Sequence, residues 1–248
     1  MDIVYVCDNN YLPYLKSSVY SVQKYNKNVN FIIISNEKLK LKFKYDINFK
    51  NITFNPDSSL FKFKQNDRMR EATYYKLFIP ELLKDYDKIL FLDCDVLCQK
   101  PLNSLWEINC EYMGVAESHS YGEKQARELG LKKYASAGVL LMNLKKLREI
   151  NFTTGCLDLL SELPNVPQHD ETLINLFLKD KLTFIDQKYN YSHNRIYRNP
   201  IPERDAYILH FIGPSKEDML AKGRPVRTII LIIKKILRRI KNFILRSR

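Results

Sequence analysis

The sequence predicts an α/β domain with a mostly parallel central sheet, followed by a basic amphipathic helix at the C-terminus. Short apolar runs rich in β-branched residues recur along the chain, and segments with apolar residues at helical spacing lie between several of them. Strands that are buried on both faces and alternate with helices are typical of doubly wound sheets, which bind ligands beyond the carboxyl ends of their strands. We therefore expect one ligand-binding domain over residues 1–221 and a tail over residues 222–248.

The domain is predicted to open with a strand, a helix and a second strand. Ile3–Cys7 and Phe31–Ser35 are short apolar runs, and Tyr11–Tyr25 between them has the helical pattern. The apolar positions of that helix are Leu12, Leu15, Val19 and Val22. Further strands are predicted at Ile52–Asn55, Lys88–Leu92, Tyr112–Ala116 and Val139–Asn143. Further helices are predicted at Arg70–Leu83 and Glu171–Lys179.

The positive charge of the chain is concentrated at its C-terminal end. The formal net charge is +12, and Lys222–Arg248 contains ten Lys or Arg residues and no acidic residue. The rest of the chain therefore carries a net charge near +2. A nucleic-acid-binding domain usually has a basic surface of its own, so nucleic acid is not an expected partner of this domain.

Cysteine usage and hydropathy indicate a cytoplasmic protein. The five cysteines are odd in number and scattered, which does not indicate a disulfide scaffold or a zinc ribbon. An acid, Asp2, stands where a signal peptide would carry basic residues, and no apolar run reaches 18 residues. We expect reduced thiols, no exported leader and no transmembrane helix.

The sharpest local feature is the Asp-x-Asp motif Asp93-Cys94-Asp95, which directly follows the strand Lys88–Leu92. Residues two apart in an extended chain project to the same side, so both carboxylates can face one point. Two close carboxylates repel each other, and a divalent cation that prefers oxygen ligands, Mn²⁺ or Mg²⁺, removes that conflict.

Two other interpretations of this motif remain open from the residues alone. The acids could simply be solvated at the turn that ends the strand. Phosphatases of the haloacid dehalogenase type also place Asp-x-Asp after a strand, with the first Asp as nucleophile. Those enzymes normally carry the motif near the chain start and need a later acidic motif, whereas here it lies about ninety residues in and no obvious second motif follows.

Five segments, taken in order, resemble glycosyltransferase family 8, the group that includes glycogenin and bacterial lipooligosaccharide galactosyltransferases. The segments are MDIVYVCDNNYLPYLKSSVYSV, FLDCDVLCQKPLNSLW, SAGVLLMNL, DETLIN and HFIGPSKEDM. The resemblance extends from Met1 to about Met219. It implies a GT-A-type nucleotide-sugar-binding fold and a metal-dependent enzyme.

The resemblance also implies the site residues. Asp93, Asp95 and His210 would be the metal ligands, with His210 binding Mn²⁺ as a neutral imidazole. Lys216 would supply a charge for the diphosphate, and Gly213 would let the backbone approach it. The other implied UDP-sugar contacts are Asp8 and Asn10 for uracil and ribose, Lys76, Cys94, Ser136, Ala137, Gly138, Asp170 and Glu171.

Several positions depart from the family pattern. Ser136 stands where Asn is usual, Lys76 stands where Arg would offer a bidentate contact, and Glu171 stands where Gln is usual. Glu217-Asp218 replaces the usual Pro-Trp. These changes leave the donor sugar open, because sugars that differ at one hydroxyl are distinguished by the shape of the pocket.

Family 8 enzymes retain the anomeric configuration, which leaves two roles for Asp170 and Glu171. A carboxylate could form a covalent glycosyl intermediate, or the acceptor could attack from the front face within an ion pair. Glu at position 171 is a better candidate nucleophile than Gln. Alternatively the pair orients sugar hydroxyls or caps the helix, with Asp170 as the N-cap; we favour the orienting role.

The C-terminal segment 227–248 predicts an amphipathic helix that lies on a membrane. Its apolar stripe is Ile229, Ile233, Ile236, Leu237, Ile240 and Ile244. Lys and Arg occupy much of the remaining surface, which fits an in-plane helix on an anionic bilayer, where each cation adds about 1 kcal/mol. A nucleic-acid-binding arm and a solvated tail are the alternatives.

The resulting expectation is a retaining hexosyltransferase that moves a hexose from a UDP-sugar onto a lipid-linked oligosaccharide such as lipopolysaccharide or lipooligosaccharide. It would act as a peripheral protein on the inner face of a membrane, and the abundance of Lys, Ile and Asn suggests a bacterial host with an AT-rich genome. The rival is a non-catalytic membrane- or nucleic-acid-associated protein that retains the fold. A complete set of metal and diphosphate residues argues against that rival.

Overall fold

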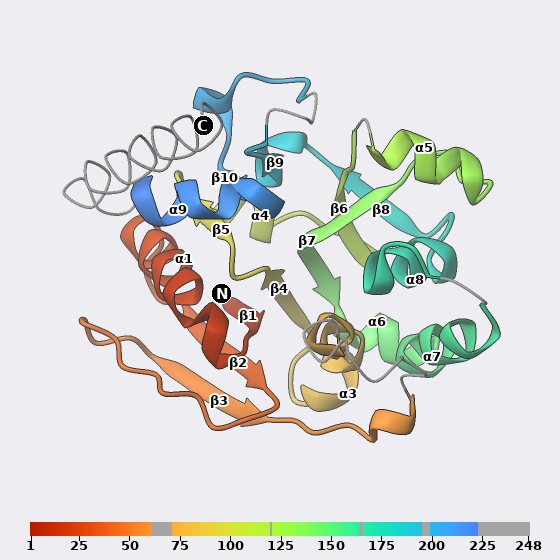
Figure 1. Cartoon of the computed structure of the whole chain (residues 1–248), viewed down its shortest axis with the longest axis horizontal. Helices are drawn as coiled ribbons and strands as arrows, with labels where there is room; N and C mark the ends of the chain where they lie inside the picture. The colour runs from red at the N-terminus through yellow and green to blue at the C-terminus, as the bar shows by residue number, and fades with distance from the viewer. Residues whose placement is uncertain (61–70, 120, 164–165, 195–198, 223–248) are drawn as a thin grey trace, which may run out of the picture.

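The computed structural model describes residues 1–60, 71–119, 121–163, 166–194 and 199–222 (Figure 1). The predicted amphipathic helix begins after residue 222 and lies outside the described residues, so this helix and the boundary at residue 221 stay predictions. No helix in the described ranges is long and apolar enough to cross a membrane. All five cysteines are buried free thiols, as the sequence predicts.

The domain is built on a seven-stranded sheet with the strand order β3-β2-β1-β4-β7-β6-β8. The strands are β1 (Asp2–Val6), β2 (Asn30–Ser35), β3 (Phe49–Thr53), β4 (Lys88–Leu92), β6 (Met113–Glu117), β7 (Ala135–Asn143) and β8 (Leu182–Ile185). Neighbouring strands are parallel except around β7, which runs antiparallel to both β4 and β6. The predicted mostly parallel sheet is therefore confirmed.

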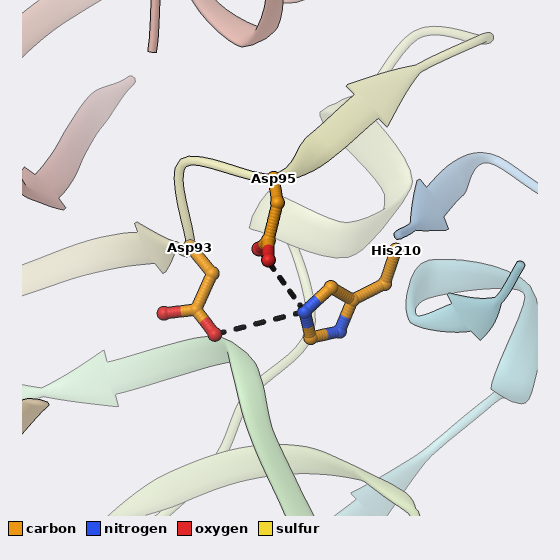
Figure 2. A group of neighbouring side chains, drawn as sticks. All are labelled: Asp93, Asp95 and His210. Carbon is orange, nitrogen blue, oxygen red and sulfur yellow. Dashed lines mark ion pairs between the residues drawn. The ribbon is translucent and has the colours of Figure 1, made fainter. Parts of the chain in front are cut away.

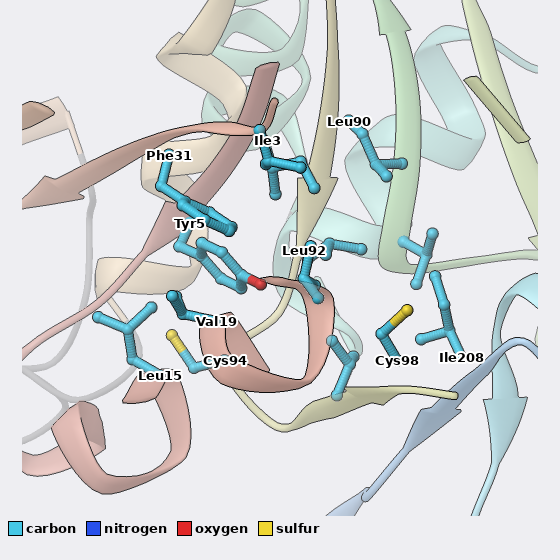
Figure 3. Close-up of a cluster of buried hydrophobic side chains, with 14 of the residues drawn as sticks. Ile3, Tyr5, Leu15, Val19, Phe31, Leu90, Leu92, Cys94, Cys98 and Ile208 are labelled. Carbon is cyan, nitrogen blue, oxygen red and sulfur yellow. The ribbon is translucent and has the colours of Figure 1, made fainter. Parts of the chain in front are cut away.

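Helices pack on both faces of this sheet over two hydrophobic clusters. Because successive residues of a strand point to opposite faces, Ile3 and Tyr5 of β1 enter one cluster and Val4 enters the other. The first cluster packs against the apolar face of α1, as Figure 3 shows. The helices of the domain are α1 (Leu12–Tyr25), α3 (Ile79–Leu82), α4 (Asn103–Trp106), α5 (Tyr121–Glu128), α6 (Leu144–Glu149), α7 (Phe152–Glu162), α8 (His169–Phe177) and α9 (Lys216–Lys222).

A second, three-stranded sheet follows the carboxyl end of β4. It consists of β5 (Val96–Cys98), β10 (Ile208–His210) and β9 (Tyr191–Ser192), with β10 in the middle. β10 pairs antiparallel with β5, and the register places His210 opposite Val96. This pairing brings His210 next to the Asp-x-Asp motif, although the two are more than a hundred residues apart in the chain.

Several predicted elements differ from the structure. β7 begins four residues before the strand predicted at Val139–Asn143. The strand predicted at Ile52–Asn55 is β3, which begins earlier and lies at the sheet edge with mostly exposed residues, so its first half carries no apolar pattern. The described part of the helix predicted over Arg70–Leu83 is a 3₁₀ helix, η3 (Ala72–Phe78), that continues into the short helix α3. The shorter 3₁₀ helices are η1 (Asn9–Tyr11), η2 (Ser58–Leu60), η4 (Gln187–Tyr189), η5 (Glu203–Asp205) and η6 (Gly213–Ser215).

Candidate active site

The two carboxylates of the Asp-x-Asp motif lie on the turn that joins the two sheets. The Asp93 backbone N–H donates to the Gly138 carbonyl at 2.9 Å, and the Phe211 N–H donates to the Asp95 carbonyl at 2.9 Å. These bonds connect the turn to β7 on one side and to the end of β10 on the other. Cys94 between them is buried, and its thiol points to the Val6 carbonyl at 3.2 Å.

Asp93, Asp95 and His210 form a cluster that could hold a metal ion (Figure 2). His210 Nε2 lies 3.3 Å from Asp95 Oδ1 and 3.7 Å from Asp93 Oδ2, and one ligand atom from each residue falls within 4.8 Å of the others. His210 Nδ1 lies 2.9 Å from Asn190 Oδ1, an acceptor, so Nδ1 carries the proton and Nε2 faces the carboxylates. Two carboxylate oxygens and one imidazole nitrogen suit Mn²⁺, so the residues fit the predicted metal.

The charges of the cluster stabilise one another. Burial alone would raise the pKa of Asp95, but the hydrogen bond and charge of His210, together with the Lys216 ammonium, hold that pKa well below its usual range. Burial would lower the pKa of His210, but Asp95 and then Asp93 raise it above the ordinary value. Asp95 therefore stays ionised and available as a ligand, and metal binding at His210 must displace a proton.

Gly138 leaves the space that the His210 ring occupies. A Cβ at position 138 would lie 2.1 Å from His210 Cε1 and 2.5 Å from Nδ1, closer than any real contact. The ring cannot retreat freely, because His210 is buried and Asn190 holds its other side. The glycine of the SAGVLLMNL segment therefore sets the position of the predicted metal ligand.

Lys76 connects the Asp-x-Asp turn to α8. Its Nζ lies 3.3 Å from Asp93 Oδ1 and 2.9 Å from Asp170 Oδ2, and it donates to the Ala137 carbonyl at 3.2 Å. The residue is only 6% exposed. Burial alone would lower the pKa of Lys76, but Asp170 and Asp93 raise it, so the ammonium stays charged.

Lys216, at the start of α9, contacts Asp95, the second carboxylate of the Asp-x-Asp motif. Its Nζ lies 2.8 Å from Asp95 Oδ2 and donates to the Tyr11 hydroxyl at 3.0 Å, with the Tyr11 ring 4.9 Å away. Burial would lower the pKa of Lys216, but Asp95 raises it. Each of the two carboxylates of the Asp-x-Asp motif is thus paired with an ammonium group, Asp93 with Lys76 and Asp95 with Lys216.

Asp170 and Glu171 lie in the first turn of α8 and point into the site. The N-cap position of α8 is Gln168, so Asp170 is not the N-cap, because the helix begins two residues earlier than the sequence pattern indicates. Glu171 Oε2 accepts a hydrogen bond from the Ala137 N–H at 2.9 Å. Burial raises the pKa of Glu171 to about 7, with the Asp170 charge adding to the rise and the Ala137 N–H opposing it.

These side chains line a cavity of about 400 Å³. The predicted site residues that line it are Asp8, Lys76, Asp93, Cys94, Asp95, Ser136, Ala137, Gly138, Asp170, Glu171, His210 and Lys216. Asn10 and Gly213 do not line it. Asp8 also accepts hydrogen bonds from the Asn10 and Tyr11 N–H groups at 2.8 and 3.0 Å, as the N-cap of η1.

Comparison with known proteins decides the family. Residues 2–217 match the profile of glycosyl transferase family 8. The chain belongs to this family. A putative glycosyltransferase of Haemophilus influenzae is 28% identical over 241 residues, and the lipopolysaccharide glucosyltransferase WaaO of Escherichia coli is 27% identical over 247 residues; each alignment spans 87% of this chain and 72% of the relative.

A solved structure shares the fold. The crystal structure of the galactosyltransferase LgtC with donor and acceptor sugar analogues superposes with a TM-score of 0.73 at 24% identity, over 86% of this chain and 88% of that chain. The GT-A-type fold expected from the sequence is therefore confirmed. Glycosyltransferases with this fold generally use a nucleotide sugar and a divalent metal, and the cavity with its Asp-Asp-His cluster is consistent with both.

Several residues that line the cavity of this family 8 protein are not among the site residues predicted from the motifs. Tyr11 contacts Lys216, and Tyr121 accepts a hydrogen bond at 2.8 Å from Gln168 Nε2, which also lines the cavity. His169 has a positive φ of 49°, which is uncommon for a residue with a side chain. The sequence signals for these residues are their positions: Tyr11 lies in the first family segment directly after Asn10, and Gln168 and His169 directly precede the DETLIN segment.

Proposed function

We propose that the protein is a retaining hexosyltransferase that transfers a hexose from a UDP-sugar to a lipid-linked oligosaccharide with the help of Mn²⁺ or Mg²⁺. The observation that carries the proposal is the geometry at the end of β4. Asp93, Asp95 and His210 converge on one point, and Lys216 stands beside them at the edge of the cavity. A protein without catalytic function has no need for this buried arrangement of charges.

In this proposal, Asp93, Asp95 and His210 hold the cation, and Asn190 keeps His210 Nε2 facing it. The bound cation supplies positive charge where the diphosphate leaving group develops negative charge as the glycosidic C–O bond breaks. Lys216 adds a second positive charge to the same group. Its present partner, Asp95, lies 2.8 Å away and is one of the proposed metal ligands, so Lys216 stands beside the proposed cation site.

Asp170 and Glu171 are proposed to orient the donor sugar opposite the leaving group. Lys76 holds Asp170 at 2.9 Å, and the Ala137 N–H holds Glu171 at 2.9 Å. A carboxylate already engaged by a buried ammonium is a poor nucleophile, which favours front-face attack over a covalent intermediate on Asp170. Glu171, with a pKa raised to about 7, can donate or accept a hydrogen bond near neutral pH.

The acceptor proposal rests on the relatives. The lipopolysaccharide glucosyltransferase WaaO and a lipopolysaccharide 1,3-galactosyltransferase of Salmonella typhimurium, 27% identical over 165 residues, have lipopolysaccharide in their names. Both act on hexoses by name, which supports a hexose donor. A lipid-linked oligosaccharide acceptor at the inner face of a bacterial membrane is the corresponding proposal for this chain.

Calorimetric titration of UDP tests the donor site. We expect UDP to bind tightly with Mn²⁺ present and weakly with a chelator, because metal ligands and diphosphate share the site. Asp95→Asn should lower the affinity for UDP in the presence of Mn²⁺ at least tenfold, since it removes a ligand charge. Asp85→Asn, a change at an exposed acid remote from the cavity, is the matched control. UDP binding that is indifferent to metal and to Asp95 would contradict the proposed site.

A further inference from the structure

The connection between β2 and β3 has an unusual form. Parallel neighbours need a crossover, which is usually a helix, but residues 36–48 cross back without helix or strand. Figure 1 shows this connection at the margin of the molecule beside the edge strand β3. Nothing in the catalytic proposal uses it.

Side chains alternate along this connection. Leu39 is 8% exposed and Ile47 is 7% exposed, and Leu41 and Phe43 pack against the cluster that α1 covers. The lysines between and beside them are all exposed. We call the exposed row Lys38, Lys40, Lys42, Lys44 and Tyr45 the lysine ridge. An extended chain with one buried face necessarily projects the alternate side chains outward.

The lysine ridge is held against the folded body. Asn9 Nδ2 donates to the Lys38 carbonyl at 3.4 Å, and the Lys40 N–H donates to Asn9 Oδ1 at 3.1 Å. Further along, the Lys44 N–H donates to the Tyr20 hydroxyl of α1. The Tyr20 ring contacts Tyr45 edge-on at 5.4 Å. The positive charges are therefore fixed in a row relative to the domain.

The charges of the ridge are not neutralised by neighbours. Glu37 and Asp46 flank the row, but no acid lies within it. None of the four lysines forms an ion pair with a carboxylate of the described residues. Lysines outside the ridge take part in most of the salt bridges of the described residues. Because the chain outside the C-terminal tail has a net charge near +2, four uncompensated lysines in seven residues are a local concentration of charge.

Exposed aromatic rings accompany the lysines. Tyr45 is 61% exposed and Phe49, at the start of β3, is 40% exposed. Lysine stems with charged ends and amphipathic tyrosine rings are the side chains that favour a membrane interface. Nucleic-acid sites instead interleave several exposed rings with the cations, so that each ring can stack on a base. The lysine ridge has one exposed ring, Tyr45 at its end, and Phe43 between the lysines is packed inward.

We propose that the lysine ridge is a contact surface for a bilayer that carries anionic lipid headgroups, separate from the predicted C-terminal helix. The proposal rests on the proposed function in one respect, since a lipid-linked acceptor places the reaction at a membrane. Asn9, which holds the backbone of Lys38 and Lys40, directly follows Asp8 of the cavity lining. Contact through the ridge would therefore bring the donor cavity close to the bilayer surface.

Vesicle binding of the full chain tests the proposal. The ridge variant replaces Lys38, Lys40, Lys42 and Lys44 with Gln, and the control variant replaces the exposed Lys124, Lys132, Lys145 and Lys179 with Gln. Both lose the same charge and keep the C-terminal tail. With vesicles of phosphatidylcholine and phosphatidylglycerol at low salt, we expect the affinity of the ridge variant to fall at least tenfold, because each lysine at such a surface adds about 1 kcal/mol. The control variant should bind like the wild type.

A fluorescence measurement tests directly whether the lysine ridge touches the bilayer. In Tyr45→Trp, the added tryptophan should shift to shorter wavelength and be quenched by brominated lipid. Tyr112→Trp, beside β6 at the far side of the sheet, should show neither change. Equal losses in both lysine variants, or no quenching at position 45, would overturn the proposal, as would binding of the ridge to RNA instead of vesicles.

The two proposals can fail separately. Release of UDP from a soluble donor does not need a membrane, so the ridge variant should release UDP at the wild-type rate. If the wild type binds vesicles through the ridge but never binds or releases UDP, the proposed function fails and the contact surface stands. If UDP chemistry is present and vesicle binding does not depend on the ridge, the reverse holds.

Discussion

At the scale of single residues, the metal cluster depends on the absence of one side chain. His210 is fixed from one side by Asn190 at 2.9 Å, and its ring fills the space beside Gly138. The two carboxylates approach Nε2 from the Asp-x-Asp turn, so the ligand set depends on the relative positions of this turn, β7 and β10. Small changes at Gly138 should therefore disturb the ligand set more than changes of similar size elsewhere in the sheet.

Gly138→Ala should weaken Mn²⁺ binding at least tenfold. The added Cβ would lie 2.1 Å from His210 Cε1, so the ring must move out of reach of the carboxylates. Gly114→Ala on β6 is the matched control, because its Cβ would meet Leu141 Cβ at 3.3 Å, a tight contact away from the metal ligands that needs a small shift and not displacement of a ring. Titration with Mn²⁺ followed by electron paramagnetic resonance measures the affinity directly. Unchanged affinity in Gly138→Ala would exclude His210 as a ligand.

Glu171→Gln should keep substantial turnover and should change how stability depends on pH. The pKa of Glu171 is about 7 in the folded protein against 4.5 for an ordinary Glu, so the folded state holds a proton that the unfolded state has lost. Stability of the wild type therefore falls as pH rises from about 4.5 to 7 and stays lower above that. Glu171 is partly exposed, so the effect above pH 7 should be about 2 kcal/mol, which Gln avoids.

Melting temperatures at pH 5 and pH 8 check this expectation. The variant should match the wild type at pH 5 and melt several degrees higher at pH 8, whereas Glu162→Gln, at an exposed position of α7, should show no such divergence. A loss of turnover by several orders of magnitude with unchanged UDP affinity would instead identify Glu171 as a nucleophile and contradict front-face attack.

Much of the residue-level site can be predicted from the sequence, because its charged members lie in compact motifs. Asp93 and Asp95 follow an apolar strand, and His210 heads a recognisable segment. Asn190 cannot be found this way, since it acts only through its contact with His210. Tyr11 lies in the first family segment, but the motif does not show its contact with Lys216. Such contacts are set by tertiary packing and leave no local pattern.

At the scale of elements, Lys76 of η3 joins the turn after β4 to α8, whose carboxylates would otherwise repel each other. It extends from η3 between Asp93 on the turn after β4 and Asp170 on α8, and it is 6% exposed. Removing one partner of a buried charged group leaves the others uncompensated, which costs far more than a surface pair contributes. The packing of α8 on the sheet therefore depends on this lysine.

Lys76→Ala should lower the free energy of unfolding by about 3–5 kcal/mol. Lys124→Ala is the control, because its pair with Glu128 at 3.6 Å is exposed and such pairs contribute under about 1 kcal/mol. Urea denaturation of both variants measures the difference. Lys76→Arg, which restores the usual family residue, should recover most of the loss. Equal stability of Lys76→Ala and Lys124→Ala would show that Asp93 and Asp170 do not need the ammonium.

Elements were predictable in proportion to their burial and length. β1, β2 and β4 each have a continuous apolar run with polar residues only at the strand ends, and the predicted bounds of β4 agree with the structure. β5, β9 and β10 have two or three residues each, too few for a period to be detected, although β10 carries His210. The antiparallel course of β7 is likewise a property of topology, since its apolar run looks the same in either direction.

At the scale of the whole molecule, two groups of charges are distinct: those of the cavity, proposed for catalysis, and those of the lysine ridge, proposed for membrane contact. The cavity at the carboxyl ends of β1 and β4 concentrates acids and lysines in mutual contact. The lysines of the ridge at the sheet margin instead pair with no carboxylate of the described residues, and Lys44 lies over the Tyr45 ring. The sequence located the basic tail but not the ridge, because four alternating lysines resemble any solvated strand until Leu39, Leu41 and Phe43 are seen to fix them in place.

Release of UDP is the most direct test of the central claim that this family 8 protein transfers a sugar from a UDP-linked donor. The measurement compares UDP-glucose, UDP-galactose, UDP-N-acetylglucosamine and UDP-N-acetylgalactosamine, each with Mn²⁺ and with chelator, in the presence of a lipooligosaccharide acceptor extract. We expect metal-dependent release from one hexose donor, abolished in Asp95→Ala and retained in Asp85→Ala. Absence of release from every donor, together with no metal-dependent binding of UDP, would contradict the claim and leave a glycosyltransferase fold without the proposed activity.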